Sequence, residues 1–160
     1  MSTIDTHLKL DGIDGESKHK DHSGEIELIG WEWGVTNPST FGKGSGGGQG
    51  KGVPLNFVFR HRYDKASPVL AKNAASGKHI ATATITARKS GDGQKDYLII
   101  KMKPVKVSSV KPYCNQDGEI IEEVSLAYED IEFEYKAQDD KGSLGGGGKF
   151  GWNIASTETR

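Results

Sequence analysis

The sequence predicts an all-β sandwich or barrel with antiparallel pairing and one short helix. Apolar and polar residues alternate over most of the 160 residues, which is the spacing of half-buried strands. Turn signals such as Gly91-Asp92-Gly93 separate these segments and join neighbouring strands as hairpins. Only one segment has helical spacing. We therefore expect a single domain over residues 1–160 with seven to nine strands.

The expected strands follow one another along the whole chain. They cover residues 6–10, 25–34, 53–59, 79–88, 96–111, 119–136 and 149–154. In the second strand the apolar phase flips between Leu28 and Ile29, which predicts either a bulge near Gly30 or partial cover on both faces. Pro104 lacks an N–H and is expected to interrupt the fifth strand.

One short helix is expected between the third and fourth strands. Ser67 fits its N-cap, and Pro68 fits the first helical position, where no N–H is needed. Val69 and Leu70 begin its apolar stripe. Gly77 stands where a left-handed residue ends a helix.

Glycine accounts for 22 residues and is concentrated in two runs. One run lies in an extended loop of residues 35–52, and the other is expected to form a loop at 145–148. Residues 42–47 match the dinucleotide fingerprint by count but belong to no βαβ unit, and Gly50-Lys51 lacks the spacing of a P-loop. We therefore expect these loops to serve assembly and predict that no cofactor binds.

The formal net charge of −1 excludes a chain that works mainly by neutralising nucleic-acid phosphates. The neutrality is a cancellation, because residues 53–114 carry +9 and residues 115–140 carry −9. A hairpin between the two longest strands would place Lys101, Lys103 and Lys106 opposite glutamates. The same segregation could also join copies of the chain head to tail.

No catalytic or metal constellation is visible in the sequence. His19 and His22 are three residues apart, but no convincing further ligands accompany them, so we interpret this turn as a solvated loop. The alternating carboxylates of residues 119–134 are typical of a charged strand face. We therefore expect no enzymatic activity and no metal site.

The tryptophans Trp31, Trp33 and Trp152 have two possible roles. They could form a carbohydrate platform, but packing in the core or in an interface is more typical of such residues. We interpret them as core or interface aromatics.

No targeting segment is visible. Residues 1–7 lack the basic start and apolar stretch of a cleaved leader, and nowhere do 18 apolar residues run together. Cys114 is the single cysteine, which favours synthesis in a reducing compartment. We expect no membrane insertion, and any export would use a route other than a cleaved signal.

Several segments in a fixed order resemble one protein family. They are residues 15–17 (GES), 20–22 (KDH), 25–34 (EIELIGWEWG), 65–70 (KASPVL), 76–80 (SGKHI), 122–133 (EEVSLAYEDIEF) and 151–153 (GWN). In order and spacing the chain resembles the haemolysin-coregulated protein (Hcp) family of the bacterial type VI secretion system. The resemblance runs from about Thr6 to Trp152.

The resemblance implies two antiparallel sheets packed as a barrel, with one helix on the flank. It also implies a homohexameric ring with a wide central hole, and rings that stack into the inner tube of a contractile machine. The implied partners are further copies of the chain, a VgrG-type spike, a contractile sheath and effectors carried in the lumen. The protein would be made in the bacterial cytoplasm and secreted without a cleaved leader.

The resemblance also points to the long loop after the second strand as the ring-stacking or subunit-interface element. Its candidate residues are Thr36, Phe41, Lys43, Gly46, Gly47, Gly48 and Lys51. Two alternatives stay open. One is a tail tube protein of a phage-like particle, and the other is a stand-alone small β-barrel that binds a ligand through the tryptophans.

Overall fold

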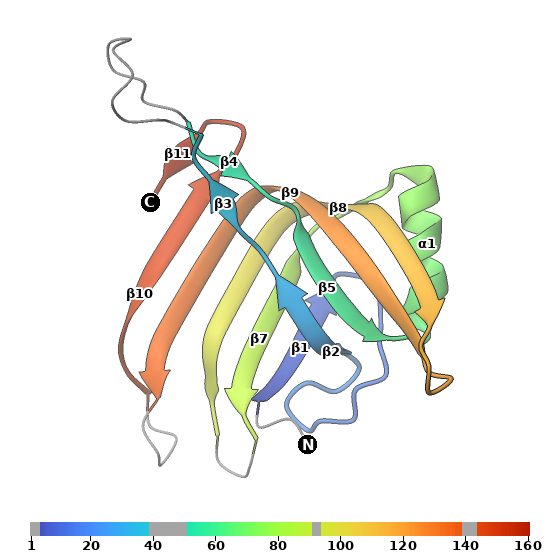
Figure 1. Cartoon of the computed structure of the whole chain (residues 1–160). Helices are drawn as coiled ribbons and strands as arrows, with labels where there is room; N and C mark the ends of the chain where they lie inside the picture. Colours follow the sequence, from blue (N-terminus) through green and yellow to red (C-terminus); the bar gives the residue numbers. More distant parts are fainter. Residues whose placement is uncertain (1–3, 39–50, 91–93, 139–143) are drawn as a thin grey trace.

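Six antiparallel strands close on themselves to form a barrel, with one helix on its flank (Figure 1). The computed structural model describes residues 4–38, 51–90, 94–138 and 144–160. The strand order round the barrel is β9, β5, β2, β1, β7 and β8, and the pairing of β8 with β9 closes it. The predicted mainly β fold is confirmed, although the second sheet is only a small hairpin of β3 and β4.

The described residues contain eleven strands and one helix. They are β1 (Ile4–Leu10), β2 (Ile26–Glu32), β3 (Val35–Thr36), β4 (Val53–Pro54), β5 (Phe57–Arg62), α1 (Ala66–Ser76), β6 (His79–Ile80), β7 (Ala83–Lys89), β8 (Asp96–Cys114), β9 (Ile120–Gln138), β10 (Leu144–Asn153) and β11 (Glu158–Thr159). The number exceeds the predicted seven to nine because several strands have only two residues.

The two longest strands, β8 and β9, pair from Leu98 to the end of β8 as the predicted hairpin. Pro104 does not interrupt β8, so that prediction is wrong. On the other side of β8, pairing with β7 ends at Met102 and pairing with β6 begins at Val105. Pro104 therefore lies at the junction between two neighbours, where β8 has no partner on that side that needs its N–H.

The second edge of β9 is shared by two strands. Residues 121–126 pair with β5, and residues 130–138 pair with β10. Since β10 begins at Leu144, the glycine run at 145–148 is strand and not the predicted loop. A Cβ at Gly147 would collide with the Tyr135 carbonyl, so this close approach of two backbones requires glycine.

The predicted bulge lies in β2. Leu28 is opposite His61, but Gly30 is opposite Arg60, so the register shifts between these pairs. Ile29, which lies at the register shift, is 50% exposed, whereas the Trp31 ring stacks on the ring of the buried Phe57. The bulge thus explains the change of apolar phase, because it turns Trp31 back toward the core.

Helix α1 flanks β8 and ends as predicted, with Gly77 at a φ of 71° donating its N–H to the Asn73 carbonyl. Its start differs from the prediction. Asp64 accepts a hydrogen bond from the Ala66 N–H, and the Ser67 hydroxyl accepts one from the Asp64 N–H. Ser67 is therefore not the N-cap. It lies inside the first turn of the helix, and the Asp64 side chain caps that turn. Among the described residues, no helix is suited to spanning a membrane.

Large apolar side chains fill the barrel interior. Fully buried examples are Leu8, Ile26, Phe57, Phe59, Ile85, Ile100, Met102, Leu126 and Ile131. Next to this core, His61 and Glu122 are also buried, with His61 Nε2 2.8 Å from Glu122 Oε1. Within the described part of the chain, His61 Nδ1 has no hydrogen-bond partner, and it lies 3.8 Å from Asp64 Oδ1.

The buried His61–Glu122 pair makes stability depend on pH. Burial alone would lower the pKa of His61, but the carboxylates of Asp64 and Glu122 outweigh it and raise the pKa from 6.5 to about 9. Because the folded-state pKa is raised, the contribution is complete below pH 6.5 and is lost as pH rises through 9. Denaturant unfolding should show a loss of roughly 3 kcal/mol or less across this window.

The double variant His61→Gln with Glu122→Gln is the control for this prediction. It keeps a hydrogen-bonding pair of similar size but carries no titratable group. The variant should lose the pH dependence between 6.5 and 9. An unchanged pH profile would show that another group is responsible.

Candidate assembly surface

The predicted assembly loop starts and ends in a small two-stranded sheet, which we call the arm root (residues 34–36 and 52–55). Val35 pairs with Pro54 and Thr36 pairs with Val53. The arm root leaves the barrel at the end where β11 and the C-terminus lie (Figure 1). Of the candidate loop residues, Thr36 and Lys51 are described and exposed. Phe41, Lys43, Gly46, Gly47 and Gly48 lie outside the described residues.

A chain of hydrogen bonds ties the arm root to the barrel. The Leu55 N–H donates to the Gly34 carbonyl at 3.0 Å, which continues the small sheet toward β5. The Leu55 carbonyl accepts a hydrogen bond of 2.7 Å from the Tyr128 hydroxyl on β9. That hydroxyl in turn accepts from Trp33 Nε1. Tyr128 therefore connects β9 to Leu55 in the arm root and to Trp33, which directly precedes it.

Aromatic rings pack between the arm root and the barrel. The Trp33 ring lies 4.9 Å from the Phe133 ring and 6.2 Å from the Phe150 ring, measured between centroids. Trp152 is buried, and a Cβ on Gly52 would lie 3.3 Å from its ring, so the arm root passes directly over it. Tight contact at Gly52 leaves little room for a larger residue.

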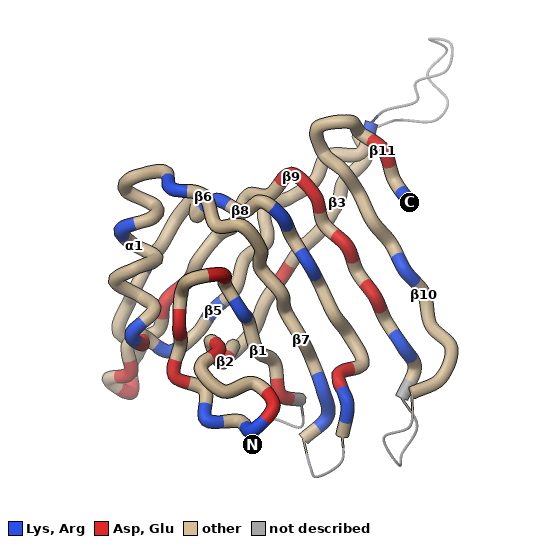
Figure 2. Tube along the Cα trace, turned by 180° about the vertical axis from the view of Figure 1, so that it is seen from behind, with Lys and Arg blue, Asp and Glu red and all other residues tan. Residues whose placement is uncertain are grey.

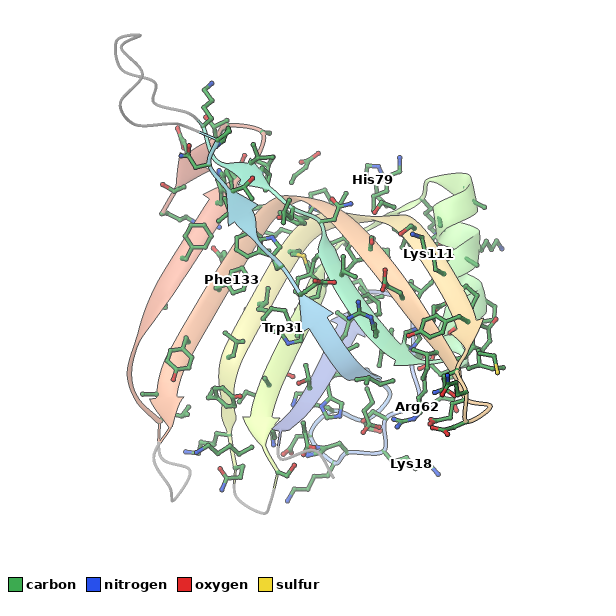
Figure 3. The ribbon with its side chains drawn as sticks, viewed as in Figure 1. Lys18, Trp31, Arg62, His79, Lys111 and Phe133 are labelled. Carbon is green, nitrogen blue, oxygen red and sulfur yellow. The ribbon has the colours of Figure 1, made fainter. Side chains whose placement is uncertain are left out.

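The three tryptophans do not form an exposed platform for a sugar. Trp31 and Trp33 are half-buried and pack against the core, and Trp152 is buried. In Figure 3, Trp31 and Phe133 lie on the same side of the curved sheet. A sugar-binding platform needs ring faces open to solvent, so the geometry favours packing.

Both faces of the arm root carry exposed aliphatic side chains. Val35, Val53 and Leu55 are 49%, 46% and 47% exposed. Val53 and Leu55 flank Pro54 and therefore point to one face of the small sheet, whereas Val35, which is opposite Pro54, points to the other face. A cluster of exposed aliphatic side chains is typical of a surface that another protein covers.

The opposite charges of the two central strands face each other within the β8–β9 hairpin (Figure 2). Lys101 is opposite Glu132 and Lys103 is opposite Asp130, as predicted. The prediction for Lys106 is wrong, because its partner is Ala127. The segregation along the chain therefore becomes cross-strand pairing in space.

A C-terminal arginine also engages the acidic strand. Arg160 donates to Asp130 Oδ1 at 2.7 Å and also contacts Glu132. Its hydrogen bond lowers the pKa of Asp130. Arg160 also exchanges backbone hydrogen bonds with Gly151, where its side chain occupies the space that a Cβ would need. The carboxylates of β9 are thus largely engaged within the chain.

The solvated-loop interpretation of His19 and His22 is wrong for His22. Its side chain is buried against His7, Arg88 and Asp96, which come from three other strands. Sequence spacing could not show this, because every partner on the sheet is distant in the chain. Within the described part of the chain, no group of histidine, cysteine or carboxylate side chains could hold a metal ion.

Comparison with known proteins gives one consistent family. The profile described as "Type VI secretion system effector, Hcp" matches residues 7–135. The chain is 37% identical to protein hcp1 of Pseudomonas aeruginosa over 154 residues, covering 94% of this chain and 95% of the relative.

Solved structures extend the similarity to the fold. The structure of Hcp1 from Salmonella typhimurium has a TM-score of 0.82 at 35% identity, covering 99% of this chain and all of the other. A structure described as a type six secretion system protein has a TM-score of 0.90 at 30% identity, covering 98% and 99% of the two chains.

The Tyr128 hydroxyl should hold the arm root in place. Tyr128→Phe removes the acceptor of the Trp33 N–H and the donor to the Leu55 carbonyl. We expect a loss of about 1–2 kcal/mol in the free energy of unfolding and faster amide exchange at Leu55. Tyr135→Phe is the matched control because that tyrosine is 48% exposed, and it should change stability little. Equal effects of the two variants would contradict the anchoring role.

Proposed function

Because this chain belongs to the Hcp family of the type VI secretion system, we propose that it is a structural subunit of that system's inner tube. The observation that carries this proposal is the family match over most of the chain together with a barrel that superposes on an Hcp structure from end to end. The subunit works by shape and carries no reaction. Homohexameric rings of it stack into the tube.

An open sheet edge supports ring formation. Among the residues described, the outer side of β10 is bonded to residues 158–160 only at Gly151, Trp152 and Asn153. Within that part of the chain, residues 144–150 present an edge without a partner strand, and four of them are consecutive glycines. Exposed edges attract other strands and are usually paired or covered. In a closed ring a neighbouring subunit covers this edge.

The arm root supports stacking of the rings. Rings that stack in one direction need two different complementary surfaces on each subunit. The arm root projects from one end of the barrel, far from the β8–β9 turn at the opposite end (Figure 1). Its exposed Val53 and Leu55 provide an apolar surface for a neighbouring copy on one face, and Val35 is exposed on the other face. We propose that the 35–52 arm reaches a subunit of the next ring.

The barrel interior of the subunit is filled with side chains, which limits where cargo could be carried. Among the described residues, Phe57, Phe59 and Leu126 fill the barrel interior and leave no room there for a ligand. We propose that effectors ride in the central hole of the ring. The same packing disfavours a stand-alone ligand-binding barrel. A VgrG-type spike and a contractile sheath are the further proposed partners, and the protein leaves the cytoplasm through the secretion machine.

Mass in solution tests the ring. Native mass spectrometry of the purified chain should give a particle of six times 17.3 kDa. Negative-stain images should show annular particles with an open centre. A stable monomer at the concentrations used for imaging would contradict the proposal.

Variants of the arm separate stacking from ring closure. Deleting residues 42–50, or changing both Val35→Glu and Val53→Glu, should leave the ring mass unchanged and reduce tube formation, because both remove arm contacts. Val69→Glu on the outside of α1, where the side chain is 40% exposed, is the matched control and should keep both. Tubes of normal length from the arm variants would refute the role of the arm in stacking.

A further inference from the structure

The segment between β1 and β2 lies over the outer face of the sheet, and we call residues 14–24 the histidine loop (Figure 2). Its backbone folds back on itself. Gly15 donates its N–H to the Gly24 carbonyl, and Gly24 donates to Ser17, both at 2.8 Å. Ser17 also donates to Glu25 at 2.9 Å. These backbone hydrogen bonds hold the loop in its folded form, so the amide protons of Gly15, Ser17 and Gly24 report whether the loop is closed.

The central attachment of the histidine loop to the sheet is a cluster of polar and charged side chains. His22 Nδ1 lies 3.0 Å from Glu25 Oε2, and His22 Nε2 lies 3.2 Å from Asp96 Oδ1 on β8. Arg88 on β7 contacts Asp96 at 2.8 Å and Asp21 of the loop at 2.9 Å. Two loop side chains, Asp21 and His22, are thus joined to a pair of sheet residues.

His7 on β1 lies beneath this attachment and has poor surroundings for a positive charge. It is 3% exposed, and its ring is stacked on the His22 ring at 4.8 Å and 11°. His19 presents its ring at 5.3 Å, and Arg88 lies beside His22. His7 Nδ1 has no hydrogen-bond partner among the described residues. A proton on this imidazole would be buried next to other basic groups.

The charged and titratable groups around His7 come from every element packed against it. They are Asp5 from β1, His19, Asp21 and His22 from the loop, Glu25 just after it, Arg88 from β7, and Asp96 from β8. Burial is the largest effect, followed by His22 and His19, and together they lower the pKa of His7 from 6.5 to about 4. The charges of Glu25 and Asp5 oppose the shift only partly.

We propose that the histidine loop is a proton-sensitive latch, closed while His7 is neutral and opened when His7 takes up a proton. Opening exposes His7 to water, where its pKa returns to the ordinary 6.5. The open state therefore binds one more proton between pH 6.5 and pH 4, and acid favours opening. Below pH 6.5 the opening constant rises about tenfold per pH unit.

Amide hydrogen exchange of the full chain measures the latch directly. After correction for the intrinsic exchange rate, the amides of Gly15, Ser17 and Gly24 should lose about 30-fold protection between about pH 7.5 and about pH 5. Amides in the β8–β9 hairpin should keep their protection, which separates local opening from unfolding. Loss of protection in both regions together would contradict the proposal.

Two variants and one titration identify the responsible proton. His7→Phe should remove the pH dependence of loop exchange, whereas His79→Gln, at an exposed histidine on β6, should leave it unchanged. Imidazole NMR of the wild-type chain needs no variant, and His7 should stay neutral to below about pH 5. A pH dependence that persists in His7→Phe, or a His7 that titrates at its ordinary pKa, would overturn the latch. The outcome is independent of ring or tube formation.

Discussion

The pairing of β8 with β9 is the constraint on which the rest of the structure depends. This pairing closes the barrel along one edge of β9. Because β9 is longer than β5, the other edge of β9 pairs first with β5 and then with β10. The basic and acidic segments of the chain also meet in this pairing. A single hairpin therefore decides where the barrel closes, where the charge is neutralised and where an edge remains open.

This arrangement changes how the charge pattern should be interpreted. Lys101 and Lys103 stand opposite Glu132 and Asp130, and Arg160 engages the same two carboxylates. Charges neutralised inside one subunit contribute little to attraction between subunits. The described surface offers two other features for assembly, namely the glycine-rich edge of β10 and the apolar arm root. Both depend on backbone and aliphatic contacts, which salt screens weakly.

Most of the fold follows from local patterns, and the exceptions have physical causes. The period of two, the phase flip at Leu28 and the position of Gly77 predicted the strands, the bulge and the end of the helix. The strand at 145–148 was missed because glycine has no side chain to alternate. The burial of His22 was missed because His7, Arg88 and Asp96 reach it only after folding. The arm root was missed because it forms only when Val35 pairs with Pro54, which is distant in the sequence.

A structure of the assembled particle by electron microscopy tests the central claim most directly. The account predicts a homohexameric ring in which a neighbouring subunit covers the outer edge of β10 between residues 144 and 150, with the arm root in contact with another copy. A particle in which this edge stays open to solvent and Val35, Val53 and Leu55 contact nothing would contradict the account.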